Sequence, residues 1–303
     1  MCSDLFKPMR KSKIGFIRTP HPRYSAIKDI KTLRIPSYAP SSMVIVEKWN
    51  QIIITDVVEK SLRVFDMDGT HVKCVNLIAC QMPKSVCVNE STGQVFVLDS
   101  GTIDLFGGAS GAKILVHDSS FKLLRFIFQL SNPEFISFDK VTSNLYVGEM
   151  NYRGNDHYME AYQYREYYHN SCDILVIDSN TGDIIRSIFC AKKVFFMRQT
   201  KQSMILSTSD GFLIISKLNY EIEKTIIMDL CVKFFDIFDS NFILTVKQDF
   251  NFNYSLVSID SDGNEISETK LPIDLEINDV LIFEERLILN SGFRTGYIHF
   301  IDF

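Results

Sequence analysis

The residues of this chain that could carry metal or acid–base chemistry are scattered along the sequence. The six histidines are His21, His71, His117, His157, His169 and His299. Only His157 and His169 lie close to one another, and with Asp156 they do not make a convincing zinc site. The glycine-rich run at residues 107–111 is followed by neither the lysine nor the helix of a phosphate-binding loop. We therefore expect no metal, no cofactor and no catalytic centre.

The seven cysteines include no CxxC pair, and their number is odd. The N-terminus also lacks an apolar stretch of signal-peptide length. Free thiols in a reducing compartment are the expectation, and a cytoplasmic or nuclear location follows from it.

Aromatic and basic residues are concentrated in a few segments, and the richest is Asn151–Ser171. Tyrosine and arginine dominate binding hot spots because they bury a large area and keep a polar group for hydrogen bonding. The alternative is that these tyrosines only cover the fold. The predicted partner-binding residues are Tyr152, Arg153, His157, Tyr158, Tyr162, Lys247, Phe250, Phe252, Tyr254, Phe293 and Arg294.

Short apolar runs, separated by Asp, Gly, Asn and Ser, indicate that β-strands must position these segments. A strand that ends in a residue pair such as Phe-Asp recurs at Asp66, Asp118, Asp178, Asp260 and Asp302, with a degenerate copy at Asn219. Successive copies are separated by 52, 60, 41, 41 and 42 residues. A unit of about 41 residues is typical of a four-stranded propeller blade.

The repeat predicts an all-β fold, a six-bladed β-propeller of four-stranded antiparallel blades over residues 25–303. Strands a to d of each blade run outward from the axis, and the sixth unit lacks its strand d. Closure of the ring requires that strand. We expect Lys31–Ile35 to supply it by pairing with Tyr297–Asp302, and Lys13–Arg18 is the alternative. Residues 1–24 are predicted to be a flexible basic tail.

The first unit, MVIVEKWNQIIITDVVEKSLRVFDMDGTHV, resembles an NHL repeat. Asp56, Asp66 and Gly69 match that pattern, the second unit keeps Asp99, and the third has Glu149, whereas units four to six match poorly. The resemblance implies a six-bladed propeller similar to the C-terminal domains of tripartite-motif ubiquitin ligases, which bind proteins or RNA. No RING, B-box or coiled-coil sequence precedes the repeats, so the resemblance does not imply ligase activity.

The predicted topology places all the long connections at one end of the ring. In an antiparallel meander the b–c and d–a connections share one end, and the a–b and c–d turns share the other. The long b–c connections are Ser100–Ala112, Met150–Ser171, Gln248–Tyr254 and Ser291–Gly296. Blade four has a short one, Ser209–Phe212, which predicts a trough between raised aromatic walls on blades three and five.

Charge argues for a protein partner over RNA. Residues 1–24 carry +5 and the whole chain −5, so the remainder carries −10. An acidic body gains little from counterion release on RNA. The sequence therefore predicts a non-catalytic module that binds a protein or peptide segment, with no membrane association. The alternatives are an RNA-binding NHL propeller and a metal-dependent lactonase or lyase.

Overall fold

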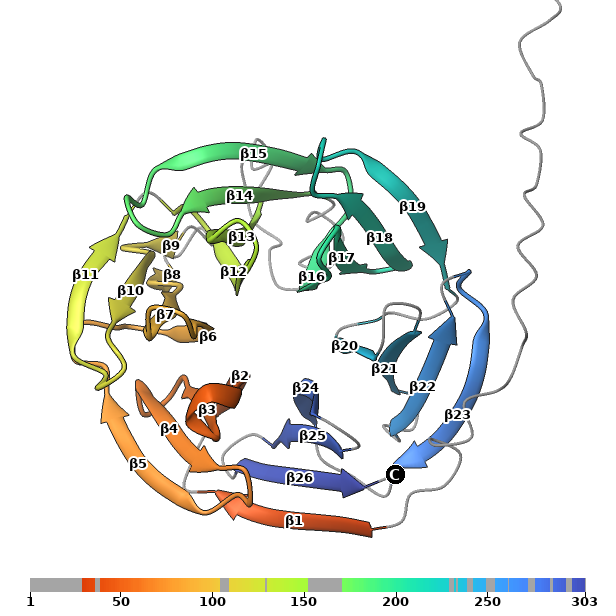
Figure 1. Cartoon of the computed structure of the whole chain (residues 1–303), viewed down its shortest axis with the longest axis horizontal. Coiled ribbons are helices and arrows are strands. Elements are labelled where there is room, and N and C mark those ends of the chain that lie inside the picture. The colour runs from red at the N-terminus through yellow and green to blue at the C-terminus, as the bar shows by residue number, and fades with distance from the viewer. Residues whose placement is uncertain are drawn as a thin grey trace, which may run out of the picture.

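Six four-stranded antiparallel sheets stand in a ring around a central axis in the computed structural model, which confirms the predicted six-bladed propeller (Figure 1). The structure describes residues 29–35, 39–103, 109–128, 130–151, 171–228, 232, 234–238, 242–248, 254–260, 262–271, 276–283, 286–292 and 296–302. The predicted tail, residues 1–24, lies outside them. No described helix is long and apolar enough to cross a membrane.

The first three blades follow one another along the chain, and each runs outward from the axis. Blade one contains β2 (Pro40–Val46), β3 (Gln51–Asp56), β4 (Ser61–Asp66) and β5 (His71–Asn76). Blade two contains β6 (Pro83–Asn89), β7 (Gln94–Asp99), β10 (Lys113–His117) and β11 (Leu123–Ile127). Blade three contains β12 (Pro133–Phe138), β13 (Asn144–Met150), β14 (Cys172–Asp178) and β15 (Ile184–Cys190).

The remaining three blades repeat this order. Blade four contains β16 (Val194–Gln199), β17 (Ser203–Thr208), β18 (Gly211–Ser216) and β19 (Ile222–Ile227). Blade five contains β20 (Phe235–Phe238), β21 (Phe242–Gln248), β22 (Tyr254–Asp260) and β23 (Glu265–Leu271). Blade six contains β24 (Ile277–Phe283), β25 (Arg286–Ser291), β26 (Gly296–Asp302) and β1 (Asp29–Ile35).

The ring closes through β1, which is the outer strand of blade six. It pairs antiparallel with β26, from Asp29 opposite Asp302 to Ile35 opposite Gly296. The predicted pairing of Lys31–Ile35 with Tyr297–Asp302 is therefore confirmed, and Lys13–Arg18 is not the closing strand.

The core consists of six hydrophobic clusters, one between each pair of neighbouring blades. Successive side chains of a strand point to opposite faces of its sheet, so one strand can contribute to two clusters. In β3, Ile52 and Ile54 pack toward blade six, whereas Ile53 packs toward blade two. This alternation explains why the blades cannot slip by one residue without exposing their core.

The repeated acidic residue at the end of strand c caps the c–d turn. The carboxylate of Asp66 accepts hydrogen bonds from the N–H groups of Asp68 and Thr70, and Asp118 and Asp260 act in the same way. In blade four this residue is Ser216, whose hydroxyl accepts from the N–H of Leu218. The predicted position of the fourth copy, Asn219, was therefore wrong, because the turn begins at Ser216.

A basic residue of strand d reaches the c–d turn of the next blade at five of the six blade boundaries. The c–d turns of blades one, three and five contain Gly69, Gly182 and Gly263 with positive φ, and those of blades two and four contain Phe121 and Tyr220 there instead. The basic residues and their targets are Lys31 to Asp68 O, Lys73 to the Phe121 ring, Arg125 to Ser179 O, Arg186 to the Tyr220 ring, and Lys224 to the Asp262 carboxylate.

Blade five is the exception. The residue of blade five at the position of the basic residue is Ser267. Ser267 lies opposite Ser258 in blade five, just as Lys73 lies opposite Val64 in blade one. Blade six has no c–d turn, because its outer strand comes from the other end of the chain. Ser267 therefore has no such turn to contact.

Candidate functional site

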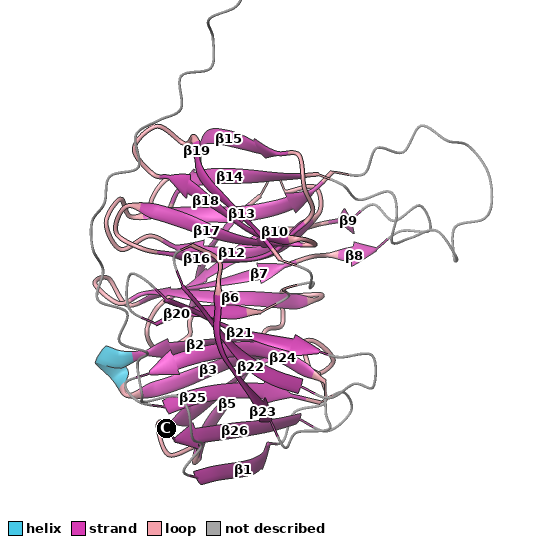
Figure 2. Cartoon of the chain, turned by 90° about the vertical axis from the view of Figure 1, so that its right-hand side faces the viewer, coloured by secondary structure: helices cyan, strands magenta, loops and turns pink. Residues whose placement is uncertain are grey.

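The two ends of the ring carry different connections. At one end lies the short helix η2 (Glu47–Trp49), which is part of an a–b connection. From the other end project two small strands of a b–c connection, β8 (Thr102–Ile103) and β9 (Ala109–Ser110) (Figure 2). We call this second end the b–c face. The described ends of the other long b–c connections belong to the same face by topology.

Most of the predicted partner-binding residues lie outside the described residues. They are Tyr152, Arg153, His157, Tyr158, Tyr162, Phe250, Phe252, Phe293 and Arg294. The backbone of Lys247 lies in β21, opposite Ser255, and its side chain is not described.

Tyr254 is the predicted residue whose surroundings are described. It begins β22, between Gln248 and Leu271 of the neighbouring strands, and is 6% exposed. Its ring packs in the cluster between blades five and six. It belongs to a strand and not to the loop in which the sequence placed it, so little of its surface remains for a partner.

Blade four has a two-residue b–c turn, Ser209–Asp210, between β17 and β18. The Lys192 ammonium lies 2.7 Å from the Asp210 carboxylate, and Lys193 lies over the Phe195 ring at 5.0 Å from its centroid. Blade four therefore presents a low, charged surface, and the ends of the longer connections of blades three and five lie on either side of it.

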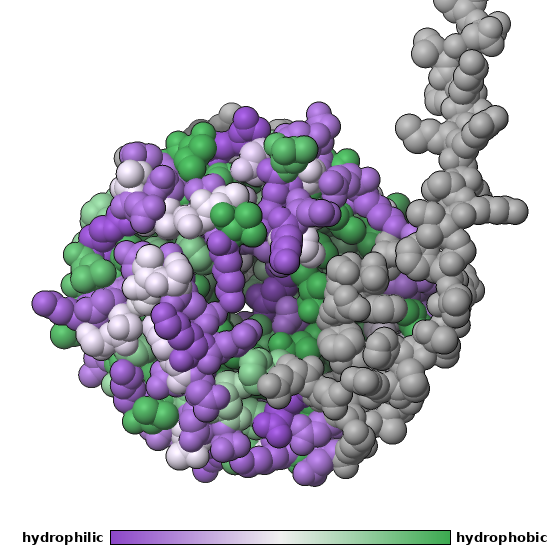
Figure 3. Space-filling model, in the orientation of Figure 1, coloured by the Kyte–Doolittle hydropathy of each residue, from purple (hydrophilic) through white to green (hydrophobic). Residues whose placement is uncertain are grey.

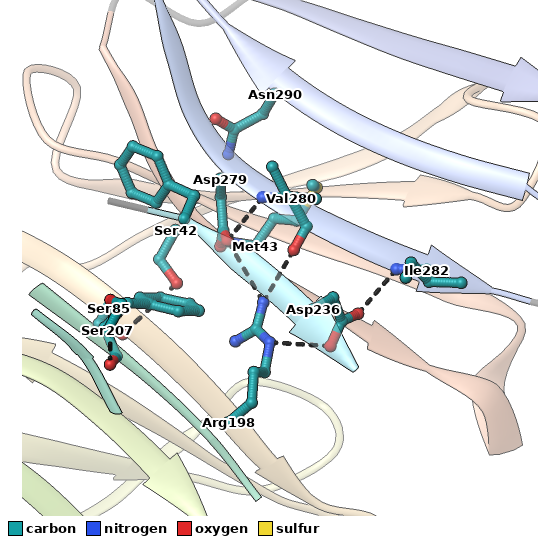
Figure 4. A network of polar contacts seen from close by, with 12 residues as sticks. Ser42, Met43, Ser85, Arg198, Ser207, Asp236, Asp279, Val280, Ile282 and Asn290 are labelled. Atoms are coloured by element: carbon teal, nitrogen blue, oxygen red, sulfur yellow. Dashed lines mark hydrogen bonds and ion pairs between the residues drawn. The ribbon is translucent and has the colours of Figure 1, made fainter. Parts of the chain in front are cut away.

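The central channel contains a second polar site, which the sequence did not predict. A hollow lies at the ring axis, with hydrophilic residues beside it (Figure 3). Arg198 of β16 points toward two carboxylates (Figure 4). Its Nε lies 3.1 Å from Asp236 Oδ1, and its Nη2 lies 3.3 Å from Asp279 Oδ1 and 2.9 Å from Val280 O. One arginine thus joins the inner strands of blades four, five and six.

The two carboxylates extend this network from blade to blade. Asp236 Oδ2 accepts a hydrogen bond from Ile282 N at 2.7 Å, and Asp279 Oδ2 accepts one from Met43 N at 2.7 Å. Burial raises the pKa of Asp279 to about 6, although Arg198 acts in the opposite direction. The network therefore holds a carboxyl group whose pKa is raised above that of an ordinary aspartate.

Serine hydroxyl groups connect the inner strands of blades one to three. Ser85 Oγ accepts a hydrogen bond from Ile136 N and donates one to Ser42 Oγ. The side-chain amide of Gln199 donates to Ser137 Oγ across the boundary of blades three and four. The inner strands of blades two and three are also joined by the Lys84–Glu134 ion pair, so this side of the ring combines hydroxyl contacts with an ion pair.

The acidic residues behind the NHL resemblance hold connections together. Asp99 accepts hydrogen bonds from the N–H groups of Gln81, Met82 and Gly101, and pairs with Lys113 at 2.9 Å. Burial opposes ionisation, but these donors hold the pKa of Asp99 below its ordinary value. Asp56 and Glu149 likewise accept from nearby backbone N–H groups. Asp56 fixes the turn that follows its own strand, Asp99 also holds the connection before β6, and Glu149 holds the connection before β12.

The described histidines do not converge on the channel. His117 and His299 are buried in strands β10 and β26, and His71 begins the outer strand β5. The ring nitrogens of His299 lie 2.6 Å from Ser291 Oγ and 3.0 Å from Thr32 Oγ1, so this histidine bridges the strands that close the ring. No group of three or more His, Cys, Asp or Glu suited to a metal occurs among the described residues.

A signal for the channel network is present in the sequence. Arg198, Asp236 and Asp279 each interrupt an apolar run, in VFFMRQ, FDIF and INDVLIF. A charge in an inner strand requires a partner, because an unpaired buried charge is costly. The run alone does not identify that partner, which lies on another blade.

No protein-family model matches the sequence, and no curated protein matches it at a significant level.

Proposed function

We propose that this propeller is a non-catalytic interaction module, which binds a protein or peptide segment across the b–c face. The observation that carries the proposal is the two-residue turn of blade four, which lies between blades whose b–c connections are long. Long connections on a rigid scaffold are where binding residues are usually found. A blade with a short b–c turn between two blades with long b–c connections leaves room for an extended peptide or a short helix.

Three further observations support a protein partner. The fold is one that commonly mediates protein interactions. The chain outside residues 1–24 carries −10, which disfavours the polyanion RNA. Lys193 on blade four, whose ammonium lies over the Phe195 ring, offers a contact for an acidic side chain. The NHL resemblance of the first three units and a cytoplasmic or nuclear location are part of this proposal.

The test is a pull-down with the intact chain and with a variant in which residues 152–170 are replaced by a short Gly-Ser linker. The matched control replaces the exposed residues Lys201 and Gln202, in the a–b turn of blade four at the opposite end of the ring, with Gly-Ser. We expect partners to be lost with the first variant and retained with the second. Retention by both folded variants would contradict the proposal.

Single substitutions locate the contacts more finely. Tyr158→Ala and Phe252→Ala should each weaken binding by about 1–3 kcal/mol while changing stability little. Phe196 is a contrasting control, because it is 7% exposed in the cluster between blades four and five. Phe196→Ala should destabilise the fold by about 3–5 kcal/mol. If the first two variants lower the melting temperature and leave binding intact, the aromatic residues are packing residues.

A further inference from the structure

Two of the described cysteines face each other across neighbouring strands of blade three. Cys172 begins β14, Cys190 ends β15, and the two are direct partners in the antiparallel register. The structure describes five cysteines, all of them free thiols: Cys74, Cys80, Cys87, Cys172 and Cys190. No other two of these five are paired in register.

The side chains of this pair also lie on the same face of the sheet. Cys172 and Cys190 are 0% and 2% exposed, and both belong to the cluster between blades three and four. Directly opposed residues of an antiparallel pair have Cα atoms about 4.5–5.5 Å apart. Disulfides span about 4.4–6.8 Å between Cα atoms, so the backbone separation suits a bond.

The two cysteines lie at the end of the ladder between β14 and β15, and this position allows their Cβ atoms to move closer together. Opposed Cβ atoms are about 4.5–5.5 Å apart, whereas a disulfide needs about 3.5–4.5 Å. Cys172 is the first residue of its strand and Cys190 the last of the other, so the ladder continues on one side only. The two strand ends can therefore approach without displacing an interior pair.

We propose that Cys172 and Cys190 form a reversible cross-strand disulfide, a redox modification site next to the b–c face. The oxidant is a low-molecular-weight disulfide. One protein thiolate attacks it, forms a mixed disulfide and releases the first small thiol. The second protein thiolate attacks the mixed disulfide and releases the second small thiol. The protein loses two electrons and two protons, and the oxidant gains them. This proposal does not depend on the proposed partner binding.

The surroundings of the pair predict slow formation and a preference for an uncharged oxidant. Burial raises the pKa of both thiols, and the Asp173 carboxylate adds to this effect. The Sγ of Cys172 also lies 3.6 Å from Asp173 O. Thiolates are the attacking species, so the reaction waits for opening of the strand ends. Nearby carboxylates repel an anionic oxidant.

The experiment treats the folded chain with 2-hydroxyethyl disulfide, blocks free thiols under denaturing conditions and maps the digest by mass spectrometry. We expect a Cys172 peptide joined to a Cys190 peptide, which dithiothreitol separates again. The oxidised chain should melt about 5 °C higher than the reduced chain, because the bond constrains the unfolded state. Recovery of both residues as thiols, or as two separate mixed disulfides, in a folded chain would overturn the proposal.

Variants make the assignment specific. Cys87→Ser removes a buried thiol that belongs to the cluster between blades two and three, so the cross-link should remain. Cys190→Ser, or Cys190→Ala if the serine variant fails to fold, should abolish both the cross-link and the rise in melting temperature. A cross-link between Cys172 and any other cysteine in the native chain would also contradict the assigned pair.

Discussion

The outer edge of the ring and the wall of its central channel join neighbouring blades in different ways. At the edge, one contact recurs: a basic residue of strand d meets the c–d turn of the next blade, as Lys73 meets Phe121. In the channel the contacts are made by different side chains: an oxygen of Ser85, Asp236 or Asp279 accepts a hydrogen bond from a backbone N–H of the next blade's inner strand. Arg198, Asp236 and Asp279 connect blades four to six and blade one, and serines connect blades one to three.

At the boundary of blades five and six, the channel contact is present where the outer-edge contact is missing. The outer contact is missing there, because blade six has no c–d turn for Ser267 to meet. The inner network is present at that boundary, where Asp236 of blade five accepts from Ile282 N of blade six. The repeated basic residue thus marks a contact common to the blades, and the repeat is broken at Ser267, where the next blade has no c–d turn to contact.

The largest expected effect on stability comes from removing β1, the strand that closes the ring. Deletion of residues 1–36 takes away β1, leaves β26 with an unpaired edge and removes Ile35 from the cluster between blades six and one. We expect loss of the cooperative thermal transition, measured by circular dichroism. Deletion of residues 1–24 alone should leave the transition unchanged. If the longer deletion melts like the parent, β1 does not close the ring.

Next in size is the loss of the channel arginine. Arg198→Met leaves Asp279, whose side chain is 1% exposed, without its cationic partner. Removal of one member of a buried ion pair costs about 3–5 kcal/mol in the free energy of unfolding. Arg34→Met, on the exposed outer strand, should change it by less than about 0.5 kcal/mol. Equal effects in chemical denaturation would show that the channel wall is no stronger than the edge.

The channel carboxyl group also predicts a pH dependence. The pKa of Asp279 is raised to about 6 in the folded chain, above its ordinary value of 3.8, so the folded state binds this proton more tightly. Its contribution to the free energy of unfolding should therefore increase as the pH falls from 7.5 to 5, by about 1 kcal/mol. Asp279→Asn should lose that component. Parallel pH profiles for parent and variant would place the titration elsewhere.

The smallest expected effects on stability come from substitutions at the outer edge of the ring. Lys73→Met removes a cation held 4.3 Å from the centroid of the Phe121 ring and should cost about 0.5–1 kcal/mol. Ser267→Lys restores the usual basic residue in blade five, but with no turn to contact it should change stability by less than about 0.5 kcal/mol. A clear gain from Ser267→Lys would mean that another partner occupies that edge.

The sequence predicts the repeated parts of this fold well. Strand alternation and turn residues locate six blades, and the missing strand of unit six points to Lys31–Ile35. The fourth repeat was misplaced because both Ser216 and Asn219 are turn-forming residues, and only the hydrogen bonds show that the turn starts at Ser216. The positive φ of Phe121 and Tyr220 was also beyond prediction, because non-glycine residues seldom adopt it.

The candidate sites were harder to predict than the fold. Arg198 pairs with residues 38 and 81 positions away along the chain, so local pattern cannot identify its partners. Tyr254 has the residue type of a binding residue, yet its strand buries it. Residue type thus indicates what a side chain can do, and the register of its strand decides whether a partner can reach it.

The central proposal, binding on the b–c face, is tested most directly by a photo-crosslinking amino acid placed at either end of blade four. Ser209 is an exposed residue of the b–c turn, and Leu218, which is 93% exposed, lies in the c–d turn at the opposite end. Both positions tolerate a larger side chain without loss of core packing. We predict that the probe at position 209 captures the partner and that the probe at position 218 does not. Capture at position 218 alone would contradict the proposed binding face.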